Sequence, residues 1–209
     1  MGHKHWVAAI AAALGGLIGS VAQAADHLIL PTYPNDPPMV EATHQVAGAK
    51  FLYEFIPQGE TLENYRTILS AKSFPGTTSA GPEDFLKGMF ARSSAACDGV
   101  RVNGPKSAEE GRASVAYGQV YCGRQKGKPY GVNMFFKVIQ GRDALYVIHV
   151  EFHVPPSSTG GVQAFSQDQV TEMVAMLKAQ SAANTYLVES VFLCLDGSTD
   201  PRCQAAAKN

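Results

Sequence analysis

The stretch YGVNMFFKVIQGRDALYVIHVEFHV, residues 130–154, decides the fold, because it holds two β-rich runs on either side of a short turn. Tyr130 to Ile139 and Ala144 to Val154 are rich in aromatic and β-branched side chains, which favour strands. Gln140 to Asp143 is short and contains a glycine, and a short turn joins antiparallel neighbours. The stretch therefore predicts a β-hairpin.

A third strand precedes this hairpin. Ser114 to Cys122 has a similar β-rich composition, and Gly123 to Pro129 is predicted as a turn. The three strands together predict an antiparallel meander. The turn carries basic side chains that suit either a solvated hairpin tip or contact with an anionic partner, namely Arg124, Lys126 and Lys128.

Successive side chains of a strand point to opposite faces, which divides the run Ala144 to Val154 into two sets. The set that we expect to point into the core consists of Tyr146, Ile148, Val150, Phe152 and Val154. The set that we expect on the opposite, solvent-facing side consists of Leu145, Val147, His149, Glu151 and His153.

His149, Glu151 and His153 form the one cluster in the sequence with candidate chemistry. Two imidazoles and a carboxylate are ligands that zinc accepts, and the same groups serve acid–base catalysis. Alternate residues of a strand lie roughly 6.5 to 7 Å apart, so three of them do not easily converge on one ion, and a neighbouring strand has to supply a fourth ligand. The alternative is an ordinary polar row on the solvent face of a half-covered sheet.

The sequence before the meander predicts a strand and a helix. Lys50 to Ile56 is aromatic and β-branched, and the proline and glycine that follow end it. Thr61 to Phe74 fits a helix or a strand. Gly81 to Cys97 predicts a helix whose buried stripe consists of Phe85, Leu86, Met89 and Phe90.

The sequence after the meander predicts a second helix and a further buried element. Ser166 and Gln169 have the spacing of a capping box at a helix start. Tyr186 to Leu195 is apolar and fits a helix or a strand, and Pro155 to Gly161 is a loop of small residues that we expect to be mobile. The apolar residues of the helix, which we expect to cover one face of the sheet, are Val170, Met173, Val174 and Leu177.

These elements predict an α+β fold, in which helices pack on one face of an antiparallel meander. The chain has 209 residues, and we expect one domain at residues 50–203 with a flexible tail at 204–209. A net charge of −1 gives no basic face, which argues against nucleic acid as a partner.

The first residues predict a secretory signal peptide at residues 1–24. A short basic start is followed by the apolar run Trp6 to Ile18 and by the small-x-small site Ala22-Gln23-Ala24. The run is shorter than a membrane span and includes Gly15 and Gly16, so we expect cleavage and no stable membrane insertion afterwards. The predicted location is periplasmic or secreted, with residues 25–49 forming a proline-rich arm.

The four cysteines of an exported chain would lie in an oxidising compartment, where cysteines form disulfides. An even number favours two disulfides, and three pairings of Cys97, Cys122, Cys194 and Cys203 are open. We favour the two sequence-adjacent pairs, because the residues between the last two cysteines are rich in turn formers. A zinc site is the alternative, but the sequence has no C-x-x-C pair.

The order of elements resembles the α+β sandwiches of the PsbP-like type. The residues that carry the resemblance are Phe51 to Pro57, Gly141 to Tyr146 and the helical stretch Val170 to Leu177. The segment Ile56 to Tyr65 is similar to the start of uncharacterised exported bacterial proteins. The resemblance covers most of Lys50 to Leu195 and implies an accessory role in binding or assembly, with no catalytic residue carried over.

Motifs for the common catalytic classes are missing from the sequence. It contains no G-x-S-x-G elbow, no H-E-x-x-H pair and no glycine-rich nucleotide loop, and we expect no cofactor. The expected function is therefore a non-catalytic exported domain that binds an envelope protein or a small ligand. The alternative is a metal-dependent enzyme or metal-binding protein that uses His149, Glu151 and His153.

Overall fold

A seven-stranded antiparallel sheet forms the centre of the computed structural model, which describes residues 26–157, 166–196, 198 and 200–206. The predicted signal peptide lies outside these residues. The strands run in the spatial order β2-β3-β4-β8-β7-β6-β5, and β1 (His27–Ile29) pairs separately with β9 (Phe192–Cys194). The strands of the main sheet are β2 (Met39–Ala47), β3 (Lys50–Pro57), β4 (Thr67–Pro75), β5 (Cys97–Glu110), β6 (Ala113–Gln125), β7 (Gly131–Gln140) and β8 (Ala144–Val154).

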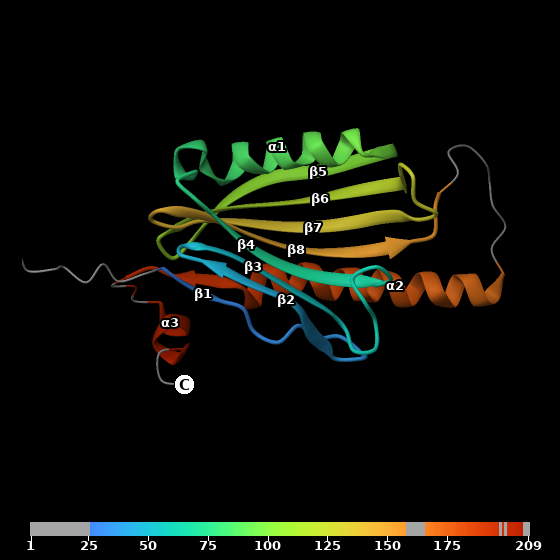
Figure 1. The fold of residues 1–209 in the computed structure, drawn as a ribbon, viewed down its shortest axis with the longest axis horizontal. Helices are drawn as coiled ribbons and strands as arrows, with labels where there is room; N and C mark the ends of the chain where they lie inside the picture. Colours follow the sequence, from blue (N-terminus) through green and yellow to red (C-terminus); the bar gives the residue numbers. More distant parts are fainter. Residues whose placement is uncertain (1–25, 158–165, 197, 199, 207–209) are drawn as a thin grey trace, which may run out of the picture.

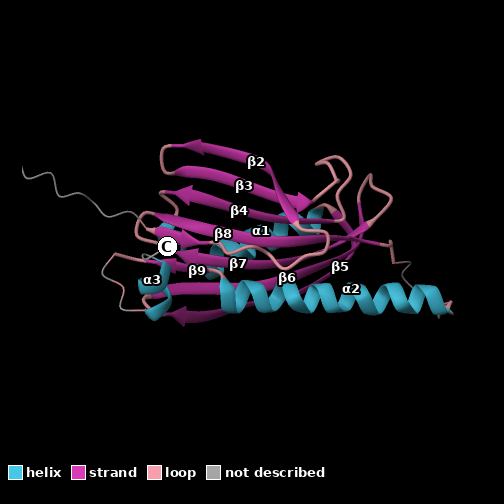
Figure 2. Ribbon diagram, turned by 90° about the horizontal axis from the view of Figure 1, so that it is seen from below, coloured by secondary structure: helices cyan, strands magenta, loops and turns pink. Residues whose placement is uncertain are grey.

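The helices lie on opposite faces of this sheet, as Figures 1 and 2 show. The α-helices are α1 (Gly81–Ala95), α2 (Gln167–Thr185) and α3 (Pro201–Ala206), with a short 3-10 turn at Thr78–Ala80 before α1 and a π-helical turn, η2 (Tyr186–Ser190), after α2. The α+β class is confirmed. The expectation that the helices share one face is not met, because α1 covers one face of β6 and β7 whereas the end of α2 packs on the other.

Two buried clusters, one on each face, explain this arrangement. Leu86 and Phe90 of α1 pack on Val138 and Val147 of the sheet. On the opposite face, Tyr186 packs with the side chains of β7 and β8 that point away from α1. Leu145 and Val147, which we expected on a solvent face, are fully buried, and the three polar residues that follow on the same face are partly buried. The expectation of a solvent face on β8 is therefore wrong.

The meander was predictable, but the strand next to it was not. Strands β6, β7 and β8 confirm the three predicted runs, and the part of the ambiguous segment from Thr67 onward forms β4. Strand β5 was missed because it is an edge strand with almost every residue exposed, so its sequence has no apolar alternation. The segment predicted as an arm contributes β1 and β2, the latter paired with β3.

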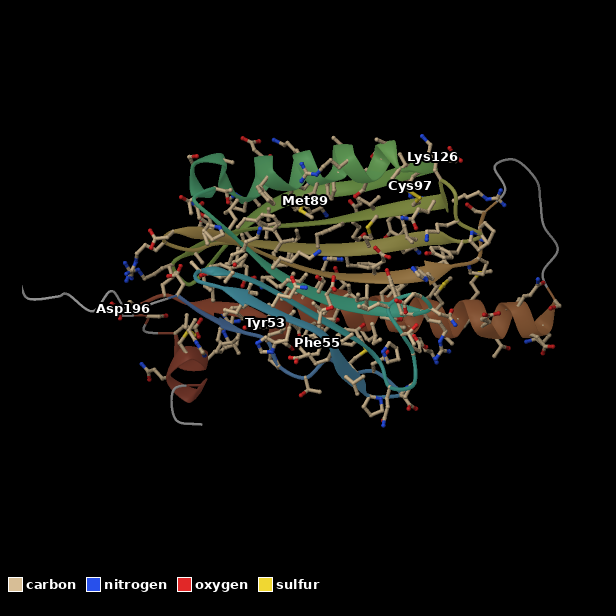
Figure 3. The ribbon with its side chains drawn as sticks, in the orientation of Figure 1. Tyr53, Phe55, Met89, Cys97, Lys126 and Asp196 are labelled. Atoms are coloured by element: carbon tan, nitrogen blue, oxygen red, sulfur yellow. A yellow bond between two sulfur atoms is a disulfide. The ribbon has the colours of Figure 1, made fainter. Side chains whose placement is uncertain are left out.

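Both predicted disulfides are present. Cys97 bonds to Cys122 and Cys194 bonds to Cys203, with a Cα–Cα distance of 5.5 Å in each pair. The first joins the start of edge strand β5 to β6, and the second joins β9 to α3. Figure 3 shows Cys97 beyond the end of α1, close to Lys126. The Lys126 ammonium donates to the carbonyl of Ala95, so a side chain of the basic turn caps the C-terminal end of α1.

Gly118 allows α1 to approach the sheet closely. A Cβ atom added to Gly118 would lie 2.3 Å from Cζ of Phe90, inside the α1 cluster. We expect Gly118→Ala to lower the free energy of unfolding by about 1–3 kcal/mol, because Phe90 has to leave its position in a packed core. Urea denaturation measures this change. Gly88→Ala on α1 is the matched control, because its Cβ meets only the end of Arg92 at 3.9 Å.

Candidate functional site

The polar cluster predicted on β8 lies beside the area that α1 covers. Helix α1 packs on β5, β6 and β7, whereas His149, Glu151 and His153 lie on β8, next to β4. We call these three residues together with Ser70 the polar strip. Ser70 lies directly opposite His149 in the register of β4 and β8, and both point to the face that α1 occupies.

The structure separates the strip into two pairs. Nε2 of His153 lies 3.4 Å from Oε1 of Glu151, and the hydroxyl of Tyr65 donates to the same Oε1 at 2.9 Å. The rings of Tyr65 and Tyr130 lie against the His153 imidazole, with centroid distances of 4.3 and 3.8 Å. His149 instead stacks on Phe136 and faces Ser70.

Three polar atoms of the strip are buried without a hydrogen bond to any described residue. They are Oγ of Ser70, Nδ1 of His149 and Nε2 of His153. A buried polar atom left unpaired costs about 1–3 kcal/mol of folding free energy, so these atoms favour the binding of a water molecule or a small polar ligand.

Burial and neighbouring groups shift the pKa values in and around the polar strip in different directions. Burial lowers the pKa of His149 to about 4, so this imidazole is neutral at pH 7. Burial alone raises the pKa of Glu151, but the nearby imidazoles of His153 and His149 and the hydrogen bond from Tyr65 outweigh it, and the net pKa is lowered. Burial and the neighbouring Glu151 raise the pKa of Tyr65. One carboxylate therefore stands beside a neutral, buried imidazole.

A metal site needs more convergence than these residues show. Among residues 26–157 and the described part of the C-terminal segment, no group of three His, Cys, Asp or Glu side chains is placed to hold one ion. Glu151 and His153 lie together, and His149 lies one alternate position farther along β8. The metal-binding role of the three residues stays a prediction.

We expect acid to destabilise the fold through His149. The unfolded imidazole titrates near 6.5 and the folded one near 4, so the unfolded chain binds more protons in this interval. The contribution of neutral His149 is complete above pH 6.5 and is lost as pH falls to 4, at a cost of about 3 kcal/mol. Urea denaturation across this range measures it. His149→Phe should flatten the dependence, whereas His44→Phe, at an exposed position on β2, should leave it unchanged.

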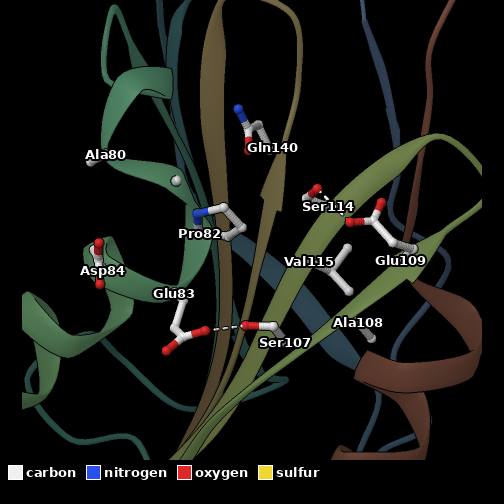
Figure 4. Close-up of a pocket in the computed structure, with 11 residues that line it drawn as sticks. Ala80, Pro82, Glu83, Asp84, Ser107, Ala108, Glu109, Ser114, Val115 and Gln140 are labelled. Atoms are coloured by element: carbon white, nitrogen blue, oxygen red, sulfur yellow. Dashed lines mark hydrogen bonds between the residues drawn. The ribbon is translucent and has the colours of Figure 1, made fainter.

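Two cavities lie elsewhere on the molecule. Figure 4 shows the first, of about 420 Å³, where the start of α1 faces β5 and β6. Its lining includes three carboxylates, from Glu83, Asp84 and Glu109, and the hydroxyl of Ser107 donates to Glu83. The second, of about 500 Å³, lies between the segment after β1 and the end of α2.

Helix α2 leaves apolar side chains exposed, which sequence reasoning missed. The capping box of Ser166 and Gln169 is confirmed. Val170, Val174 and Leu177, however, are 40%, 46% and 56% exposed and do not cover the sheet as expected. We call these three residues the α2 stripe. The only buried residues of the helix are Gln180 and Ala183, so the helix docks by its C-terminal end.

Comparison with solved structures finds a likeness in fold. No family model and no curated protein matches the sequence. The chain is similar to a solved structure of LpqN from Mycobacterium tuberculosis, with a TM-score of 0.40 and 16% sequence identity over 81% of this chain and 84% of that one. LpqN is described as involved in cell envelope biogenesis. The PsbP-like resemblance is not confirmed by these comparisons, and no helix among the described residues is long and apolar enough to cross a membrane.

Proposed function

We propose that this protein is an exported, non-catalytic domain that binds an envelope protein or a small ligand, as an accessory to envelope assembly. The observation that carries the proposal is the α2 stripe, because a helix with an exposed apolar row has a surface ready for a partner. Two disulfides fit an exported protein. Thr32 and Pro34, within the segment predicted as a proline-rich arm, line one wall of the cavity beside α2.

Site-specific photo-crosslinking in intact envelopes tests this proposal. A photoreactive residue at position 174 should give one reproducible adduct, and Leu177→Asp should abolish it. Val46 is the matched control position, because it is 59% exposed but lies on β2, which Figure 2 shows at the opposite edge of the sheet from α2. An adduct pattern that is the same from both positions, or none from position 174, would count against α2 as the binding surface.

The unpaired imidazole nitrogens favour a second candidate, a metal-binding protein that uses His149, Glu151 and His153. Calorimetric titration of the metal-free chain with zinc tests it, with the triple alanine variant as control. Saturable heat that the triple variant loses supports metal binding. No heat and no change in melting temperature removes this candidate.

A further inference from the structure

The cavity beside α2 is hydroxyl-rich and has a single charge. Its walls come from the segment after β1 and from the last turns of α2 with η2. Tyr186, at the junction, donates its hydroxyl to the carbonyl of Pro31 and meets the ring of Tyr33 edge to face, which holds the two walls together. The lining residues are Thr32, Pro34, Lys178, Ser181, Ala182, Thr185, Tyr186 and Ser190.

The α2 stripe runs directly into this cavity. Residues four apart on a helix are neighbours on one side of it. Val170, Val174 and Lys178 form one such row, and Leu177 continues to Ser181 and Thr185 in the next. The surface is therefore apolar over the first turns of α2 and changes to ammonium and hydroxyl groups where the cavity begins.

Lys178 is available to a ligand. It is exposed and makes no ion pair with a described residue, and no other residue that lines the cavity is charged. A cation that shares the lining of a cavity with hydroxyl donors suits a phosphate ester, which accepts several charge-assisted hydrogen bonds.

We propose that this surface binds a single-chain anionic phospholipid, with its headgroup in the cavity and its acyl chain along the α2 stripe. The inference rests on the proposed binding function and names its ligand. Such a lipid joins a polar headgroup to an apolar chain, just as the protein surface joins the hydroxyl-lined cavity to the apolar α2 stripe. An apolar helix from a partner or a second copy would instead cover Ser181 and Thr185 and leave their hydroxyls unpaired. A volume of about 500 Å³ is ample for a phosphoglycerol headgroup.

Calorimetry with lysophosphatidylglycerol, below its micelle concentration, tests the proposal on the chain purified after export. We expect saturable binding of one lipid per chain. Lysophosphatidylcholine, whose headgroup has no net charge, and glycerol 3-phosphate, which has no chain, should each bind at least about tenfold more weakly.

Matched variants separate the headgroup from the chain. Lys178→Glu should weaken lysophosphatidylglycerol about tenfold or more, and Lys128→Glu, in the turn between β6 and β7, should not. Leu177→Asp should weaken it by a similar factor, and Val46→Asp should not. Equal binding of both lipids, or no effect of Lys178→Glu, overturns the assignment of the headgroup.

The outcome also distinguishes this inference from the proposed function. Absence of lipid binding together with a position-174 adduct to a protein overturns the lipid and leaves the binding function standing. Absence of both overturns both. Dimers that Leu177→Asp dissociates, seen by size exclusion without lipid binding, would assign the stripe to a second copy of this chain instead.

Discussion

Glu110→Ala should lower the free energy of unfolding by about 3–5 kcal/mol, because it leaves the ammonium of Lys137 buried without a counter-charge. Lys137 lies in the middle of β7 and is fully buried. Its Nζ lies 2.7 Å from Oε2 of Glu110, at the end of β5, and also donates to the carbonyl of Val191. The hydroxyl of Tyr117 donates to the other oxygen of Glu110.

The pH dependence of this variant gives a second readout. Burial lowers the pKa of Lys137, and the hydrogen bond and charge of Glu110 oppose that change. Without Glu110 the pKa falls further, so the folded chain releases its proton at lower pH than the unfolded chain does. The deficit in stability should therefore shrink as pH rises towards the ordinary lysine pKa of 10.5.

Urea denaturation at several pH values checks both expectations. Glu109→Ala, at the exposed neighbouring position, is the matched control and should change stability by no more than about 0.5 kcal/mol. The double variant Glu110→Gln with Lys137→Met should recover much of the loss, since it removes both charges. Stability equal to the wild type in Glu110→Ala would show that Lys137 finds another counter-charge.

Removal of the disulfide between Cys97 and Cys122 should cost about 3.5 kcal/mol, because it frees a long loop in the unfolded chain. Residues 97 and 122 are 25 positions apart, whereas Cys194 and Cys203 are 9 apart. The same chain-entropy relation gives about 2.7 kcal/mol for the shorter loop.

Paired alanine variants make this comparison. Urea denaturation of the variant that lacks Cys97 and Cys122 should show the larger loss, and the variant that lacks Cys194 and Cys203 the smaller one. The first pair also holds an edge strand whose side chains are mostly exposed, so few apolar contacts replace it. A larger loss from the second pair would mean that attachment of α3 to β9 matters more than loop length.

Residue patterns predicted the elements whose signals lie within short segments. The meander follows from β-rich composition and short turns, α1 from helical spacing, and the capping box of α2 from local hydrogen bonding. Both cysteine pairings were also predicted, because each disulfide joins two consecutive cysteines of the chain. Strand β5 was not predicted, because its sequence has no strand pattern of its own and its hydrogen-bonded pairing with β6 makes it a strand.

The candidate sites were less predictable, because each depends on residues from distant segments. The sequence placed His149, Glu151 and His153 on one face, but Tyr65 and Ser70 come from the segment that it left ambiguous. Lys137 sits at an ordinary strand position, and only the fold shows that Glu110 and Val191 reach it. The stripe of α2 looked like a core face, since periodicity alone does not tell which apolar side of a helix finds the sheet.

The pairing of β1 with β9 predicts the order in which parts of the fold form. His27 lies opposite Cys194, so this small ladder joins segments near the two ends of the described chain. Local hairpins such as β7 with β8 close early, whereas a contact between such distant segments carries a large loop-closure cost and forms late. In a chain exported from its amino end, the first strand would have to wait for its partner until almost the whole sequence had crossed the membrane.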